Sequence, residues 1–326
     1  MFTKQRQIDL HLPTSWNRCT TEELEAIAAA IIQEQQRVDR YHPFDWQRVK
    51  LSIVLSINEI TISEERRVKS EEFATATDSD TYLVRRPQDK EPWAISTGQL
   101  LVLTDMLEWV DDEKADRLIF QFPYPTMQVD GSGKTAAYGE GGSKFFTLHS
   151  SLFTLQGPPP QLDGYTWREY RWLTDWMQEY MRHSNAKNAE GAAQAQREFL
   201  TILFKPAADA TGTVAAEANS SLFTLHSSLF TDFSPVKWQV ILFWWSSLMS
   251  MLAKKFPRVF KRQPVGKRRP QKADTPWDFY NCVTAMLADE YKSSEADQQN
   301  ETYSVTLQKL ENVAEKAAEM EKLKKK

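Results

Sequence analysis

Three times along this sequence, the same short pattern precedes apolar residues that recur every three or four positions. A Thr or Ser is followed three residues later by a Glu or Gln, and the pairs are Thr20 with Glu23, Ser96 with Gln99, and Thr166 with Glu169. This is the capping box, in which each side chain accepts a hydrogen bond from the other residue's backbone N–H at the start of a helix. The sequence therefore predicts a mainly α fold.

The composition is that of a globular chain without a dominant charge. The chain has 326 residues, 41% of them hydrophobic, and its 40 Lys and Arg against 44 Asp and Glu leave a formal charge of −4. This length allows about two domains with a core in each. The balance of charge excludes a general cationic field that would attract nucleic acid or anionic membranes, so any such binding has to be local.

The patterns divide the chain into five parts. Residues 1–129 are predicted to form an α+β N-terminal domain with strands over Ile8–Leu12, Thr81–Arg85 and Leu118–Phe122. Residues 130–164 are rich in Gly, Ser and Pro and are predicted to be a flexible linker. The remaining parts are a helical bundle domain (165–260) with a loop over 206–233, a basic linker (261–275), and C-terminal helices (276–326) that end in a long, largely exposed helix from Thr302.

Two segments share a repeat that has a genetic explanation. Residues 146–155 and 220–231 are windows of one seven-residue cycle, HSSLFTL. Tandem copies of the nucleotide word CACTCTT encode this cycle, because the reading frame rotates through a unit that is not a multiple of three. Replication slippage therefore explains both segments, and we expect them in loops that tolerate insertion. The alternative is a real pair of matching strands. His149 and His226 are accordingly discounted as catalytic or metal-binding residues.

The most apolar stretch and the two cysteines indicate the cellular compartment in which we expect the protein to act. Val240–Ala253 covers fourteen residues, whereas a membrane-spanning helix needs ~20, so we expect a buried helix and no membrane association. Cys19 and Cys282 are far apart, which argues against a disulfide framework or a thiolate zinc site and indicates a reducing cytoplasm. Residues 1–12 lack the continuous apolar run of a signal peptide.

No motif of a known chemistry stands in the sequence. A nucleophile elbow, an HExxH helix and a GxGxxG turn are all missing. The histidines outside the repeats, which are His11, His42 and His183, each lack a second ligand at helical spacing. We therefore predict that the protein is not an enzyme and holds no cofactor and no metal ion.

Two sets of apolar side chains are candidates for contact with a partner protein. Trp172 and Trp176 lie beside the main stripe of the helix that follows the third capping box, so they widen its apolar face. The terminal helix carries Leu307, Leu310 and Val313 on a narrow line between charged residues. Such a line is typical of a detachable, coiled-coil-like arm.

A basic segment indicates a different function. Six cations lie within twelve residues, and they are Lys261, Arg262, Lys267, Arg268, Arg269 and Lys272. They would neutralise several phosphates of a nucleic acid and bind it in a salt-sensitive way. The other interpretation, which we favour, is a solvated linker kept extended by charge repulsion, because the segment contains no aromatic residue on which bases would stack.

Five short segments carry a resemblance to a known family. They are LPTSWN (residues 12–17) with the TxEEL helix start that follows it, the aromatic helix after Thr166, FLTILFKP ending at Pro206, LAKKFPRVFK (residues 252–261), and LQKLE (residues 307–311). Their order resembles a family encoded in the tail modules of bacterial prophages, near the tape-measure gene. Together they cover most of the chain, and the two HSSLFTL repeats depart from the pattern.

The resemblance implies a non-enzymatic tail-assembly factor. It would be a chaperone or adaptor for the tape-measure protein or another helical tail protein, and it would act in the cytoplasm of the host bacterium. The resemblance brings no catalytic residues with it. Self-association is a second possibility for the apolar faces, and a DNA-associated prophage or virion protein that uses the basic segment is the alternative function.

Overall fold

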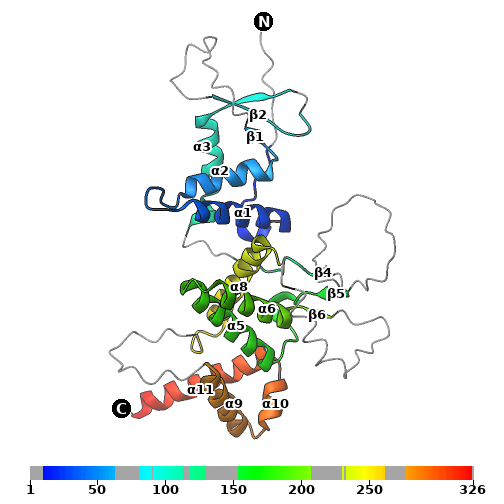
Figure 1. The fold of residues 1–326 in the computed structure, drawn as a ribbon. Helices are drawn as coiled ribbons and strands as arrows, with labels where there is room; N and C mark the ends of the chain where they lie inside the picture. The colour runs from blue at the N-terminus through cyan, green and yellow to red at the C-terminus, as the bar shows by residue number, and fades with distance from the viewer. Residues whose placement is uncertain are drawn as a thin grey trace, which may run out of the picture. The chain divides into compact units, whose positions relative to one another are not determined.

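The computed structural model describes residues 10–62, 81–89, 91–112, 118–129, 153–206, 230, 233–260 and 276–324 (Figure 1). The fold is mainly α with a small α+β part, which confirms the predicted fold class. Contacts between residues divide the chain into two compact units. The first comprises Met1–Ile119 and Ser234–Ser247, and the second comprises Phe120–Phe233 and Leu248–Lys326.

The first unit combines helices with a three-stranded antiparallel sheet. Its helices are α1 (Thr21–Arg37), α2 (Trp46–Ile57), α3 (Thr97–Asp105) and α4 (Glu108–Asp111), and its strands in sheet order are β1 (Thr61–Ile62), β2 (Thr81–Arg85) and β3 (Trp93–Ser96). The buried side chains of Ile60, Val84, Ile95 and Leu100 form a core between the sheet and α3. The predicted strand Thr81–Arg85 is thus confirmed and lies at the centre of the sheet.

Two of the predicted capping boxes start helices of this unit. The hydroxyl of Thr20 accepts the N–H of Glu23 at 3.2 Å, and the Glu23 carboxylate accepts the N–H of Thr20 at 2.7 Å. Ser96 and Gln99 make the same two bonds at 3.2 and 2.9 Å. Because these bonds join residues only three positions apart, the starts of α1 and α3 follow from the local sequence alone.

The second unit is built from helices and a second small sheet. Its helices are α5 (Trp167–Asn185), α6 (Ala189–Leu203), α9 (Pro276–Glu290), α10 (Glu295–Asn300) and α11 (Tyr303–Lys324), and its strands in sheet order are β4 (Thr126–Val129), β5 (Phe153–Gln156) and β6 (Lys205–Pro206). Helix α8 (Pro235–Lys255) contributes its residues up to Ser247 to the first unit and those from Leu248 to the second. Val240, Ile241 and Leu248 of α8 are fully buried, as predicted for this apolar helix.

Two of the predicted strands do not form. Leu10–Leu12, the described part of the predicted Ile8–Leu12 strand, has no strand structure, and neither has Leu118–Phe122. Instead, the backbone N–H of His11 donates to the Asn58 side chain at 2.8 Å, and the N–H of Ile119 donates to Ser247 Oγ at 2.7 Å. Side chains therefore satisfy the backbone groups that a neighbouring strand would otherwise have paired.

The predicted linker and domain boundaries also need correction. Residues 153–164 lie within the predicted linker, yet Phe153–Gln156 forms the central strand of the second sheet, and Leu155 and Leu162 are buried. Pairing of β5 with β4 places residues 120–129 in the second unit and not in the N-terminal domain. Helices α9, α10 and α11 belong to the same unit as α5 and α6, so the C-terminal helices are not a separate part.

The repeat segments are described only in part. Residues 146–152 and most of 220–231 lie outside the described residues. The end of the first repeat forms β5, so this part is not a loop. From the second repeat, Phe230 is buried, and its ring centroid lies 5.8 Å from that of Phe204. The HSSLFTL repeats therefore contribute both a strand and a core residue to the second unit.

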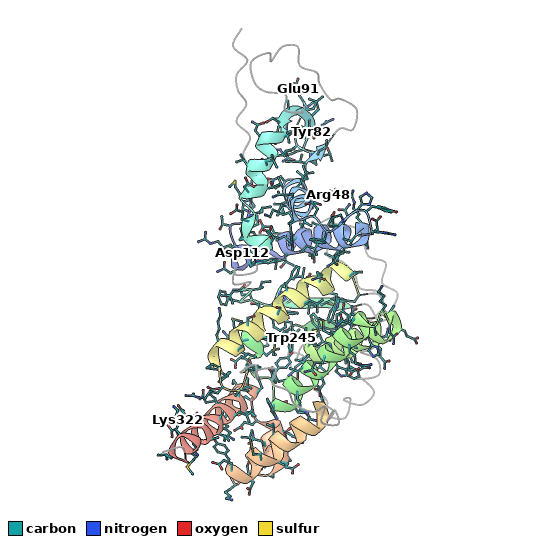
Figure 2. The ribbon with its side chains drawn as sticks, turned by 90° about the vertical axis from the view of Figure 1, so that its left-hand side faces the viewer. Arg48, Tyr82, Glu91, Asp112, Trp245 and Lys322 are labelled. Atoms are coloured by element: carbon teal, nitrogen blue, oxygen red, sulfur yellow. The ribbon has the colours of Figure 1, made fainter. Side chains whose placement is uncertain are left out.

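Helix α11 is less exposed than predicted. In its first half, Tyr303, Thr306, Leu307 and Glu311 are all buried. In its second half, Met320 is 57% exposed. The prediction of a largely exposed helix therefore holds only for the last turns, where Lys322 is labelled in Figure 2.

Candidate partner-binding groove

An apolar groove of about 390 Å³ opens on the second unit. Four segments that are far apart in the sequence form it, namely the first turn of α5, the turn after α8, α9 and α11. The lining residues are Trp167, Tyr170, Val259, Phe260, Val283, Met286, Leu307, Leu310, Val313, Ala314 and Ala317. None of them carries a charge, so the groove is suited to an apolar surface and not to an ion or a phosphate.

Aromatic rings from two helices form one end of the groove. The rings of Trp167 and Tyr170 stack with their centroids 5.8 Å apart, and Tyr170 stacks on Tyr303 of α11 at 4.8 Å. The indole N–H of Trp167 donates to the hydroxyl of Thr284 on α9 at 3.2 Å. These contacts tie α5, α9 and α11 together, so this end of the groove is preformed.

Backbone bonds reinforce the same junction. The third predicted capping box forms, with the Thr166 hydroxyl accepting the N–H of Glu169 at 3.2 Å and the Glu169 carboxylate accepting the N–H of Thr166 at 2.8 Å. The N–H of Trp167 donates to the carbonyl of Glu301 at 2.7 Å, and that of Tyr303 donates to the carbonyl of Tyr165 at 3.0 Å. The first turns of α5 and α11 are therefore joined in a fixed register.

Glu311 holds the turn after α8 against α11. Its side chain is only 8% exposed, and its two oxygens accept the backbone N–H groups of Arg258 and Val259 at 3.0 to 3.2 Å. The Arg258 guanidinium adds an ion pair to Glu311 at 3.1 Å. Because Val259 and Phe260 line the groove, this carboxylate positions one of its walls.

The charges beside the groove are paired with one another. Arg258 also reaches Glu315 at 2.8 Å, and Lys316 reaches Glu290 of α9 at 3.1 Å. Exposed pairs of this kind contribute little to stability. Two cations, Arg258 and Lys316, thus pair with three carboxylates, those of Glu290, Glu311 and Glu315, so these groups beside the groove are engaged with one another.

The structure gathers only some of the predicted site residues. Leu307, Leu310 and Val313 all line the groove; Leu307 is 1% exposed and belongs to the core, whereas Leu310 and Val313 are half-buried. Trp172 and Trp176 are half-buried on α5 and do not line the groove. The six predicted phosphate-binding residues, Lys261, Arg262, Lys267, Arg268, Arg269 and Lys272, lie outside the described residues.

Several groove residues were not recognised in the sequence. Val259 and Phe260 come after the proline that ends the apolar helix, and Val283 and Met286 lie three positions apart on α9. The spacing of Val283 and Met286 predicts a shared helix face. It does not reveal that this face meets α11, because that contact joins separate helices.

The described residues contain neither a cluster of potential metal ligands nor a membrane-spanning helix. No three His, Cys, Asp or Glu residues among them are placed to hold a metal ion together. No helix in the described ranges is long and apolar enough to cross a membrane. Comparisons with family models, with curated proteins and with solved structures find no match to this chain.

Replacing Glu311 tests its role in positioning the groove wall. Glu311→Gln removes the ion pair with Arg258, and one of the two oxygens that hold the backbone N–H groups of Arg258 and Val259 becomes an NH₂ group that cannot accept a hydrogen bond. We expect a loss of about 2 kcal/mol in the free energy of unfolding and faster amide hydrogen exchange at both residues. Glu315→Gln is the matched control, since Glu315 bonds the same arginine at an exposed site and its loss is expected to cost less than about 0.5 kcal/mol. Equal effects of the two changes would contradict this role.

Proposed function

We propose that this protein is a non-enzymatic binding protein that holds an apolar helix of a partner in the groove of its second unit. The observation that supports this proposal is the groove itself. Its walls are entirely uncharged, one end is fixed by stacked rings, and Met286 on its rim is 43% exposed. Laying an amphipathic helix into such a groove is a common mode of recognition.

We further propose that the partner is a helical tail protein of a prophage, with the tape-measure protein as the leading candidate. The support is the resemblance of the segments LPTSWN, FLTILFKP, LAKKFPRVFK and LQKLE to the tail-module family. Two of these segments lie at the groove, since LAKKFPRVFK includes Val259 and Phe260, and LQKLE includes Leu307, Leu310 and the wall-positioning Glu311. A protein that covers apolar helix faces before assembly would serve as a chaperone or adaptor in the host cytoplasm.

Co-expression with the tape-measure protein encoded in the same prophage tests the proposal. The tape-measure protein is expected to co-purify with the wild-type chain. Met286→Asp places a charge on the rim of the groove at a partly exposed position, so the chain should still fold, and the affinity is expected to fall at least tenfold because the carboxylate would be desolvated on binding.

The matched control lies in the first unit. Val102 is 63% exposed on α3, and Val102→Asp introduces the same charge at a residue that does not line the groove. It is expected to leave the association unchanged. Absence of any association with the wild-type chain would overturn the tape-measure assignment. Equal binding by Met286→Asp and the wild type would overturn the groove as the site.

A further inference from the structure

The apolar line of α11 continues beyond the groove. Leu310, Val313 and Ala317 line the groove, and Met320 follows at the same alternating spacing of three, four and three residues. This is the spacing of the a and d positions of a coiled coil, which bring side chains onto one seam of a helix. We call these four residues the α11 seam.

Exposure increases along the α11 seam. Leu310 and Val313 are half-buried, Ala317 is exposed, and Met320 is 57% exposed. The seam runs over eleven residues, or about 15 Å of helix. An apolar line that is covered at one end and open at the other matches a helix that receives a second helix alongside it. A strand would not match, because its side chains alternate with a period of two.

Residue size and charge both restrict the occupant. Ala314 and Ala317 are small and lie at the C-terminal end of the groove-lining part of α11, so a partner backbone can approach closely there. The nearby charges are already engaged, as Arg258 pairs with Glu315 and Lys316 pairs with Glu290. A charged face would therefore have to compete with these existing ion pairs and would lose hydration on binding.

We propose that the occupant is a single α-helix of a partner protein, packed along α11 through an uncharged aliphatic face with heptad spacing, and that the contact extends past the groove to Met320. The inference rests on the proposed function in that the groove receives an apolar helix of a partner protein. It adds that the bound helix runs along α11, that its contact face has heptad spacing, and that the contact includes a residue outside the groove.

A synthetic helix tests this contact without a natural partner. The probe is a fluorescent, monomeric, net-neutral helical peptide of about three heptads with Leu and Ala at the a and d positions. Its binding to the full chain is followed by fluorescence anisotropy at low and high salt. We expect binding that changes less than about threefold with salt, because the buried contact is apolar.

Two substitutions on α11 separate the seam from the rest of the helix. Met320→Asp is expected to weaken peptide binding at least tenfold, because it places a carboxylate in the apolar contact. Gln308→Glu adds the same charge at an exposed position on the side of α11 opposite the seam, and it is expected to change binding less than about twofold. Both positions are exposed, so thermal unfolding should show that both variants fold like the wild type.

The outcomes distinguish this inference from the proposed partner. Equal losses in both variants, a salt dependence above about tenfold, or no peptide binding would each overturn the inference. A dimer that Met320→Asp dissociates, in the absence of peptide binding, would also overturn it and assign the seam to a second copy of the chain. Peptide binding without tape-measure binding would support the inference and overturn only the proposed partner.

Discussion

Gly157→Ala is expected to destabilise the second unit by about 3 kcal/mol. A Cβ atom at this position would lie 2.3 Å from the carbonyl oxygen of Tyr124 and 2.7 Å from the ring of Phe122. The residue cannot move away freely, because its N–H donates to the carbonyl of Pro125 at 2.9 Å. Relief of the clash therefore requires a shift of the backbone that follows β5 or of the segment that leads into β4. Chemical unfolding of the purified chain measures the loss.

Gly98→Ala is the matched control for this substitution. Gly98 lies in the first turn of α3, and the nearest atom to an added Cβ is the Ser96 hydroxyl oxygen at 3.9 Å. Because Ala is the better helix former, this change is expected to be neutral or to stabilise by up to about 1 kcal/mol. A similar loss in both variants would show that the close approach at Gly157 is not the cause.

Asp175→Asn is expected to stabilise the protein by about 2 kcal/mol at pH 7. Asp175 on α5 is only 7% exposed, and neither of its carboxylate oxygens has a hydrogen-bond partner among the described residues. Burial raises the pKa of this carboxyl to about 6, with Glu179 adding to the rise and Arg171 opposing it. At neutral pH the buried, ionised Asp175 carboxylate therefore destabilises the folded state, and the neutral Asn amide removes this charge.

The pH dependence of unfolding gives a second measure of the same group. The folded-state pKa of Asp175 lies above the ordinary value of 3.8, so protonation favours the folded state. This contribution is fully present below about pH 4 and is lost as the pH rises through about 6. Wild-type stability should therefore fall across this interval, and Asp175→Asn should remove that part of the fall.

Glu319→Gln provides the control for the charge effect. Glu319 is exposed on α11, so loss of its charge is expected to change the free energy of unfolding by less than about 0.5 kcal/mol at either pH. If the free energy of unfolding changed with pH in the same way in the wild type and in Asp175→Asn, the assignment of this pH dependence to Asp175 would be wrong.

The helix starts were the most predictable part of the fold. The boxes at Thr20, Ser96 and Thr166 all formed. Each of these signals acts within one helical turn, so no knowledge of the rest of the chain is needed. The same holds for the apolar character of α8, which by itself predicts burial.

The strands were predicted less well. Leu10–Leu12 and Leu118–Phe122, both predicted to be extended, gave no strands, whereas Phe153–Gln156 formed one inside a segment predicted to be a linker. A strand depends on a partner edge, and the partners of β5 are residues 126–129 and 205–206. Composition near Phe153 carries no information about those distant segments.

The candidate site likewise combines features that the local sequence predicts with features that depend on distant segments. From the sequence alone, Leu307, Leu310 and Val313 were assigned to one face of a terminal helix, because helical spacing is a property of neighbouring residues. Only the tertiary structure joined that face to Met286 and to Trp167, which bonds Thr284 across 117 positions of the chain. Helices and their apolar faces arise from contacts within a few residues, while a groove exists only where faces from distant segments come together and leave space between them.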